Sequence, residues 1–244
     1  MKNEKTSRAN CIDCPIRHQA VCSEADVVEL ERLNSIKEYR HFEAREPIFW
    51  RGDELQYVAS IVEGVATLGK TLTNGQSQMV GLLLPSDFIG HPGRTRIEFD
   101  VLAVSDVTLC CFDHGQFQEL LIEMPHISQR MVQRALDELD AARDWMLLLG
   151  RKSAEEKVAT FIELVARRQQ IAQHAGLTAQ LVMPLSRGDM AGYLGLTLET
   201  VSRQIGKMKS DGILEFSDKW HFKVIDMERL QSATGDDDDG GVIY

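Results

Sequence analysis

The stretch that most constrains the fold spans residues 186–212, SRGDMAGYLGLTLETVSRQIGKMKSDG, and has the pattern of two short amphipathic helices joined at a glycine. Ser186 and Thr197 stand where a hydroxyl caps each helix, and Gly195 suits the end of the first. Gly212 is placed to end the second helix, whose apolar residues follow helical spacing: Val201, Ile205 and Met208. The segment therefore predicts a helix-turn-helix, a unit that places its second helix in the DNA major groove.

The opposite side of the second helix carries side chains that suit DNA recognition. Glu199 can accept from cytosine N4, Arg203 can donate to guanine O6 and N7, and Ser202 suits either role. We expect these three residues to read bases and a further set to contact the DNA backbone: Arg187, Thr197, Thr200, Lys207 and Lys209. The alternative, from spacing alone, is an ordinary pair of packed helices with a solvated charged face.

A hairpin pattern follows the second helix directly. Residues 213–216 and 220–225 flank the polar turn residues Ser217, Asp218 and Lys219. A hairpin at this position predicts a winged helix-turn-helix and weakens the alternative of an ordinary helix pair.

Three cysteines stand close together near the start of the chain, in CIDCPIRHQAVC. Cys11, Cys14 and Cys22 lie in a segment too short to have its own core, and Cys110 and Cys111 follow much later, in VTLCCFDHG. Three thiols at this spacing with a distant fourth favour a shared metal site, which zinc and iron-sulfur clusters both accept. The spacing of the cysteines alone slightly favours zinc over an iron-sulfur cluster.

The cysteine content also bears on the compartment. Five cysteines are an odd number, and the opening residues, MKNEKTSRAN, lack the apolar core of a secretion signal. No apolar run approaches the ~18 residues that a membrane span needs. We therefore expect a cytoplasmic protein with reduced thiols, no disulfide framework and no membrane partner.

Two different patterns fill the middle of the chain. Residues 26–124 alternate short apolar runs with turn signals, which predicts an antiparallel, jelly-roll-like β-roll. Residues 125–149 lack an internal proline or glycine and predict one long helix. Its apolar residues cover two adjacent faces, so we expect a dimerisation helix that includes Met131, Ala135, Leu139, Ala142, Met146 and Leu149. The alternative is a helix buried within one chain.

The fold expected is thus α+β, in five parts. A cysteine-bearing leader (1–25) precedes the β-roll (26–124) and the dimerisation helix (125–149); a winged helix-turn-helix (150–230) and a disordered acidic tail (231–244) follow. The net charge of −10 does not exclude DNA, because residues 151–234 carry 12 Lys and Arg against 10 Asp and Glu.

This order of parts resembles the Crp/Fnr superfamily of bacterial regulators over nearly the whole chain. The most specific element is GDMAGYLGLTLETVSRQIGKM, whose E-x-x-S-R core is similar to the base-reading signature of the Fnr branch. MLLLGRKSAEEKVATFIELVARR is also similar to that branch, and the three leader cysteines resemble those of its Fnr/FnrL-type oxygen-responsive members.

The resemblance implies a cofactor, a target and partners. It implies an oxygen-labile 4Fe-4S cluster on Cys11, Cys14, Cys22 and one residue of the Cys110-Cys111 pair. Alignment of LCCFDHGQFQEL with the family selects Cys110, and strand alternation would turn Cys111 to the opposite face. It further implies a homodimer that binds double-stranded DNA at a TTGAT-N4-ATCAA-like palindrome, contacts RNA polymerase and controls genes at low oxygen.

The chain departs from some relatives at informative positions. The stretch FIGHPGRTRIEFDV has Arg94 and Arg96 but not the Arg-Ser step of cyclic-AMP binders, so no cyclic nucleotide is expected. Haem would need a ligand such as His41 or His91, and we disfavour it. Ala142 stands where the best-known member has an aspartate that opposes pairing, so we expect a dimer even without the cluster.

Two other classes of function make different demands on the sequence. A zinc- or thiol-redox-dependent DNA-binding regulator would use the same cysteines without iron. An enzyme is disfavoured, because the sequence shows no catalytic triad spacing, phosphate-cradling glycine loop or H-E-x-x-H motif.

Overall fold

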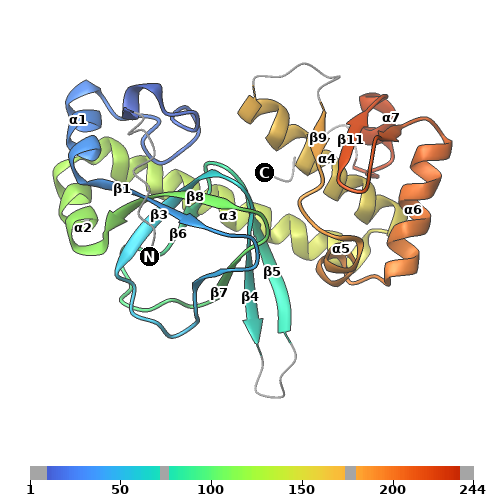
Figure 1. Cartoon of the computed structure of the whole chain (residues 1–244), viewed down its shortest axis with the longest axis horizontal. Coiled ribbons are helices and arrows are strands. Elements are labelled where there is room, and N and C mark those ends of the chain that lie inside the picture. Colours follow the sequence, from blue (N-terminus) through green and yellow to red (C-terminus); the bar gives the residue numbers. More distant parts are fainter. Residues whose placement is uncertain (1–9, 72–76, 174–179, 237–244) are drawn as a thin grey trace. The chain divides into compact units, whose positions relative to one another are not determined.

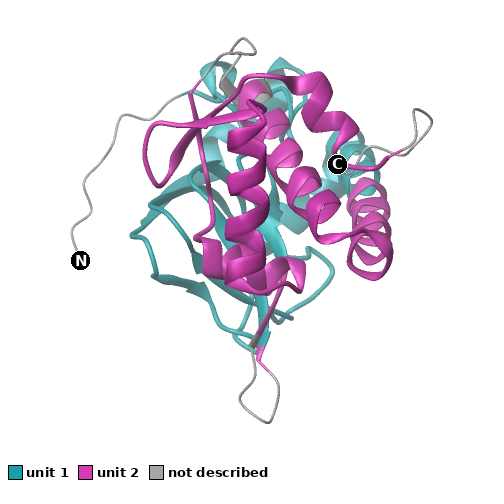
Figure 2. Cartoon of the chain, turned by 90° about the vertical axis from the view of Figure 1, so that its right-hand side faces the viewer, with its two compact units in different colours: residues 1–70, 81–134 teal, residues 71–80, 135–244 magenta. Residues whose placement is uncertain are grey.

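The computed structural model describes residues 10–71, 77–173 and 180–236. The chain divides into two compact units, residues 1–70 with 81–134 and residues 71–80 with 135–244 (Figure 2). Antiparallel β-sheets and long helices make the fold α+β, as expected (Figure 1). None of the helices in the described ranges is both long enough and apolar enough to cross a membrane.

Two four-stranded sheets form the β-roll. The first has the order β1 (Lys37–Phe42), β8 (Val107–Asp113), β3 (Tyr57–Glu63) and β6 (Phe88–Ile89). The second has the order β2 (Pro47–Phe49), β7 (Asp100–Ala103), β4 (Ala66–Thr71) and β5 (Ser77–Leu83). Strand β8 pairs with β1 and with β3, both antiparallel, and consecutive residues from Leu109 to Phe112 are buried. Both of its faces are therefore covered.

The prediction for residues 26–124 missed two helices, α1 (Val27–Ile36) and α2 (His114–Glu123), and the leader contains a further short helical turn, η1 (Cys11–Asp13). Helix α1 begins with a reciprocal capping box, in which Asp26 accepts from the Glu29 N–H (2.8 Å) and Glu29 accepts from the Asp26 N–H (2.9 Å). This signal is legible in the sequence as an acidic residue three positions before a glutamate.

Two long helices follow. Helix α3 spans Pro125–Arg151, two residues beyond the end that the composition predicted, and α4 spans Ala154–Gln173. Leu148 of α3 is fully buried, as are Phe161 and Ile162 of α4.

The second unit also contains the helix-turn-helix and its wing. Helices α5 (Arg187–Leu194) and α6 (Leu198–Ser210) are joined at Gly195, which has a φ of 64°. The Ser186 and Thr197 hydroxyls accept from the N–H groups three residues ahead, as predicted. Gly212, with a φ of 71°, follows the C-cap residue Asp211 and ends α6 in the left-handed conformation, also as predicted. The wing has the order β10 (Leu214–Phe216), β11 (His221–Val224) and β9 (Leu181–Val182).

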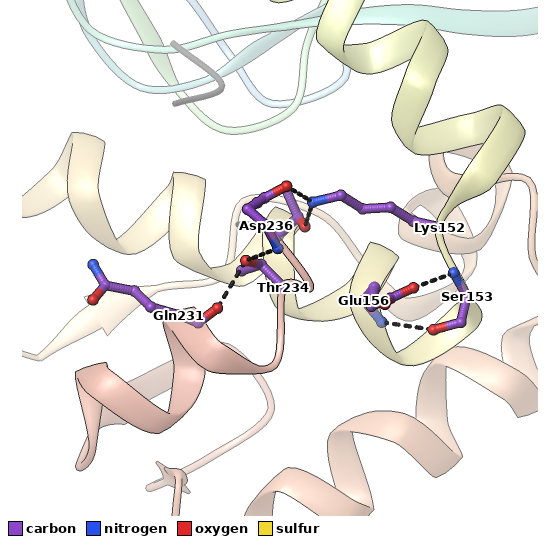
Figure 3. A network of polar contacts seen from close by, with 7 residues as sticks. Lys152, Ser153, Glu156, Gln231, Thr234 and Asp236 are labelled. Atoms are coloured by element: carbon purple, nitrogen blue, oxygen red, sulfur yellow. Dashed lines mark hydrogen bonds and ion pairs between the residues drawn. The ribbon is translucent and has the colours of Figure 1, made fainter. Parts of the chain in front are cut away.

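The C-terminal end differs from the expected disordered tail at residues 231–236. Helix α7 (Met227–Ser232) runs into this range, Thr234 is buried, and Asp236 forms an ion pair with Lys152 (Figure 3). The remainder of the expected tail, residues 237–244, lies outside the described residues.

Candidate cysteine site and nucleic-acid interface

The leader cysteines and strand β8 meet at one small cavity. Cys11, Cys14, Cys22 and Cys110 all line it, and its volume of about 20 Å³ gives room for about one water molecule. Cys111 is buried as well but does not line the cavity. Successive side chains of a strand point to opposite faces, which explains why only one residue of the pair reaches the leader.

The electrostatics of the site follow from its burial. Burial raises the pKa of Cys22 to about 11, and it also raises the pKa values of Cys14 and Cys110. Nearby thiols add to the effect at all three residues, since thiolates that lie close together repel one another. These three thiols are therefore neutral near pH 7, and a bound metal cation would reverse this because a coordinating thiol loses its proton.

The sequence reading missed two polar residues at the same cavity. Ser60 and Tyr39 are the register partners of Cys110 on β3 and β1, so all three form one row across the sheet. The Lys37 Nζ lies 3.5 Å from the Cys11 Sγ and 5.2 Å from the centre of the Tyr39 ring. No local pattern could have found these residues, because strand pairing brings them to the cysteines.

The leader is attached to the rest of the first unit by hydrogen bonds. The Cys11 N–H donates to Asn34 Oδ1 of α1 (3.3 Å), and the Arg134 guanidinium of α3 donates to the Gln19 carbonyl (3.0 Å). Arg134 also forms an ion pair with Asp87 (3.1 Å), and both side chains are largely buried. Arg134 therefore links the leader between Cys14 and Cys22 directly to the long helix.

Helix α3 has an apolar face that the described residues leave exposed. Met146 is 73% exposed, Val132 62% and Leu136 52%, and Leu139 and Leu149 are also exposed. Of the residues expected at a dimer contact, Ala135 and Ala142 are exposed too, whereas Met131 is half-buried and packs against the core of the first unit. Trp145 is half-buried and stacks on Tyr193 of α5, with ring centres 4.3 Å apart.

Helix α6 presents the three residues predicted to read bases. Glu199, Ser202 and Arg203 are exposed, while Val201 and Ile205 point into the core. Hydrogen bonds from its own backbone N–H and from the Thr197 hydroxyl lower the pKa of Glu199. The carboxylate is therefore ionised at neutral pH and can only accept hydrogen bonds, which suits the amino group of cytosine.

The residues predicted to contact the DNA backbone already make different contacts within the protein: ring contacts, an ion pair and a helix cap. Arg187 and Lys209 both lie over the Phe216 ring of the wing, at 4.9 and 5.5 Å from its centre. Lys207 forms an ion pair with Glu155 of α4 (2.7 Å), and Thr197 caps α6 through the Thr200 N–H. The Lys207 pair is exposed, so phosphate can compete for the lysine at little cost.

Comparisons with known proteins identify the family. Residues 39–123 match the cyclic nucleotide-binding domain family and residues 179–233 the Crp-like helix-turn-helix domain family. The chain is 49% identical to the transcriptional activator protein FnrL of Cereibacter sphaeroides, over 95% of this chain and 94% of that protein. It belongs to the Crp/Fnr family.

Other Crp/Fnr members extend the comparison. The chain is 40% identical to the nitrogen fixation regulation protein FixK of Bradyrhizobium diazoefficiens, over 84% of this chain and 85% of that protein. The structure of FixK2 from Bradyrhizobium japonicum superposes with a TM-score of 0.73 at 28% identity, covering 81% of this chain and 97% of that one. This Crp/Fnr protein is therefore a DNA-binding transcription activator of the Fnr/FixK type and not an enzyme.

The family name of the first domain does not identify its ligand in this Crp/Fnr protein. In the stretch where cyclic-AMP binders have their Arg-Ser step, Arg94 forms an ion pair with Glu98 (2.9 Å). Arg96 donates to the Gly52 carbonyl (2.7 Å). Both arginines thus already have partners on the protein.

Proposed function

We propose that this activator senses oxygen through a 4Fe-4S cluster held by Cys11, Cys14, Cys22 and Cys110, and that it binds DNA as a homodimer. The observation that carries the proposal is that these four cysteines, which come from the leader and from β8, line one cavity. When bound, the cluster supplies an oxygen-reactive iron centre.

The donor set fits such a group. Four thiols are the usual ligands of a 4Fe-4S cluster, and each thiolate binds a different iron atom. Four thiolates also suit zinc, so metal analysis rather than the donor set decides between the two groups.

The chain itself connects the cysteine site to the dimerisation helix. The leader contacts α3 through the hydrogen bond from Arg134 to Gln19, so a change in the position of the leader reaches the helix without an intermediary. The exposed apolar face of α3 is the surface that a second copy would cover. A preferred leader position can thus favour one dimer geometry.

At the DNA, we assign base reading to Glu199, Ser202 and Arg203 on a TTGAT-N4-ATCAA-like palindrome. Backbone contacts are assigned to Arg187, Thr197, Thr200, Lys207 and Lys209. RNA polymerase is the further partner, and the cytoplasm is the expected location. Because FIGHPGRTRIEFDV lacks the Arg-Ser step of cyclic-AMP binders, we expect no cyclic nucleotide in the β-roll.

The decisive experiment is anaerobic purification followed by visible spectroscopy and iron and sulfide analysis. We expect a broad brown absorbance that bleaches in air, together with weaker operator binding after bleaching. Cys110→Ser should abolish the absorbance, whereas the adjacent Cys111→Ser should retain it. A colourless wild-type protein that contains zinc, or neither metal, and binds its operator normally would refute the proposal in favour of the zinc or thiol alternative.

A further inference from the structure

Ser60 lies in the cysteine cavity with an unused hydroxyl. The residue is 3% exposed and lines the cavity, and within the described ranges its Oγ has no hydrogen-bond partner. A buried hydroxyl without a partner costs free energy that folded proteins normally avoid. The position of this hydroxyl, across from Cys110 in the sheet register, suggests that its partner belongs to whatever the four cysteines hold.

Lys37 provides a second donor at the same site, from the opposite neighbouring strand. Its Nζ approaches the Cys11 Sγ at 3.5 Å, and its stem passes on the side of β1 that carries Tyr39. Strand β8 therefore has a donor on each side, Ser60 on β3 and Lys37 on β1, with Cys110 between these strands.

We infer that Ser60 and Lys37 are positioning residues that donate hydrogen bonds to the sulfur atoms of the bound cluster and its thiolate ligands. The inference rests on the proposed function. Hydrogen bonds to sulfur and local charge are among the factors that set the reduction potential of an iron-sulfur cluster. Donors stabilise the more negative sulfur, so removing one makes the cluster easier to oxidise and less well held.

The test uses the full-length protein, loaded with iron and sulfide under anaerobic conditions. For Ser60→Ala and Lys37→Met we expect a midpoint potential shifted to more negative values and a several-fold faster loss of the brown absorbance in air. Lys37→Arg retains a donor and should recover most of the wild-type lifetime. Both readouts report on the cluster and do not depend on DNA binding.

Ser86→Ala is the matched control. Ser86 is also buried in the first unit, with 1% exposure and, among the described residues, no partner for its Oγ, but it does not line the cysteine cavity. We expect its loaded protein to match the wild type in potential and lifetime.

A second measurement separates the inferred role from a general effect on folding. In the iron-free protein, Ser60→Ala removes a hydroxyl that has no partner, so its thermal midpoint should stay unchanged or rise. The same change should shorten the cluster lifetime in the loaded protein. A purely structural serine would change both in the same direction, and that result would overturn the inference.

The failures of the two proposals are distinguishable. If the wild type loads but Ser60→Ala and Lys37→Met match Ser86→Ala in potential and lifetime, the inference is wrong while the proposed function stands. If the wild type takes up neither iron nor sulfide, the proposed function is wrong and the inference falls with it.

Discussion

Lys152 and Asp236 form an ion pair with 2.6 Å between the Nζ and the Oδ1, which joins the residue after α3 to the segment after α7 (Figure 3). The Lys152 side chain is only 7% exposed and also donates to the Thr160 hydroxyl (2.9 Å). A buried ammonium needs such partners because its desolvation is costly. The pair therefore attaches the C-terminal segment to the junction of α3 and α4.

Asp236→Asn should lower the free energy of unfolding by about 1 to 3 kcal/mol, because it leaves the Lys152 charge buried with one neutral partner. Glu215→Gln, at an exposed position of β10 in the same unit, is the control and should have little effect. Urea unfolding of the full-length protein, followed by a signal from the second unit, measures the free energy of unfolding of both variants. Equal stability of the two variants would show that the pair contributes nothing.

Arg203→Ala should weaken binding to the specific operator by about 1 to 3 kcal/mol and relax the choice of base at its guanine. Lys209→Ala should instead weaken all DNA sequences alike and reduce the salt dependence, since a phosphate contact carries no sequence information. Binding titrations of both variants on operator DNA and on random DNA, at several salt concentrations, measure these effects. Indistinguishable losses on both DNAs would refute these assignments.

The iron-free protein should still form dimers at micromolar concentration, because Ala142 adds no like-charge repulsion to the exposed face that includes Leu139 and Met146. Ala142→Asp should weaken the dimer at least about tenfold, which corresponds to roughly 1.4 kcal/mol. Gln129→Glu adds the same charge elsewhere on α3 as a control. Sedimentation that shows a clean wild-type monomer would contradict the prediction.

Arg134→Met should reduce the difference in dimer affinity between loaded and iron-free protein, because it removes the hydrogen bond from α3 to the Gln19 carbonyl. Arg143→Met is the control, since Arg143 lies on the same helix in an exposed pair with Asp140. Sedimentation in both states measures the difference. If Arg134→Met retains the full wild-type difference in dimer affinity, the cluster does not influence dimerisation through this contact.

The turn of the wing should loosen in acid. The backbone N–H groups of Trp220 and His221 hold the pKa of Asp218 down at about 2, against an ordinary value of 3.8. The contribution of a carboxyl with a lowered pKa is fully present above the ordinary value and is lost as the pH falls through the folded value. Protection of the Trp220 and His221 amides, measured as exchange relative to the intrinsic rate at each pH, should therefore fall below about pH 4, and Asp218→Ala should remove this pH dependence.

Local chemistry in the sequence was sufficient to predict the DNA-reading part of the protein. Helix caps such as Ser186 and Thr197, the turn at Gly195 and the spacing of Val201 and Ile205 act over three or four residues, so the pattern and the structure agree. The capping box of Asp26 and Glu29 also depends on residues only three positions apart. The prediction missed α1 because residues 26–36 were grouped with the strand pattern that follows them.

By itself, the sequence determined which residues have the chemistry of the proposed sites: four thiols, three side chains suited to base contacts and an apolar stripe on a long helix. The tertiary structure places Cys110 rather than Cys111 beside the leader cysteines, as the resemblance implied, and it alone decided that Ser60 and Lys37 join that site and that Asp236 partners Lys152. The physical reason is that strand register and helix packing bring together residues that are far apart in the chain, and short-range patterns carry no information about those pairings.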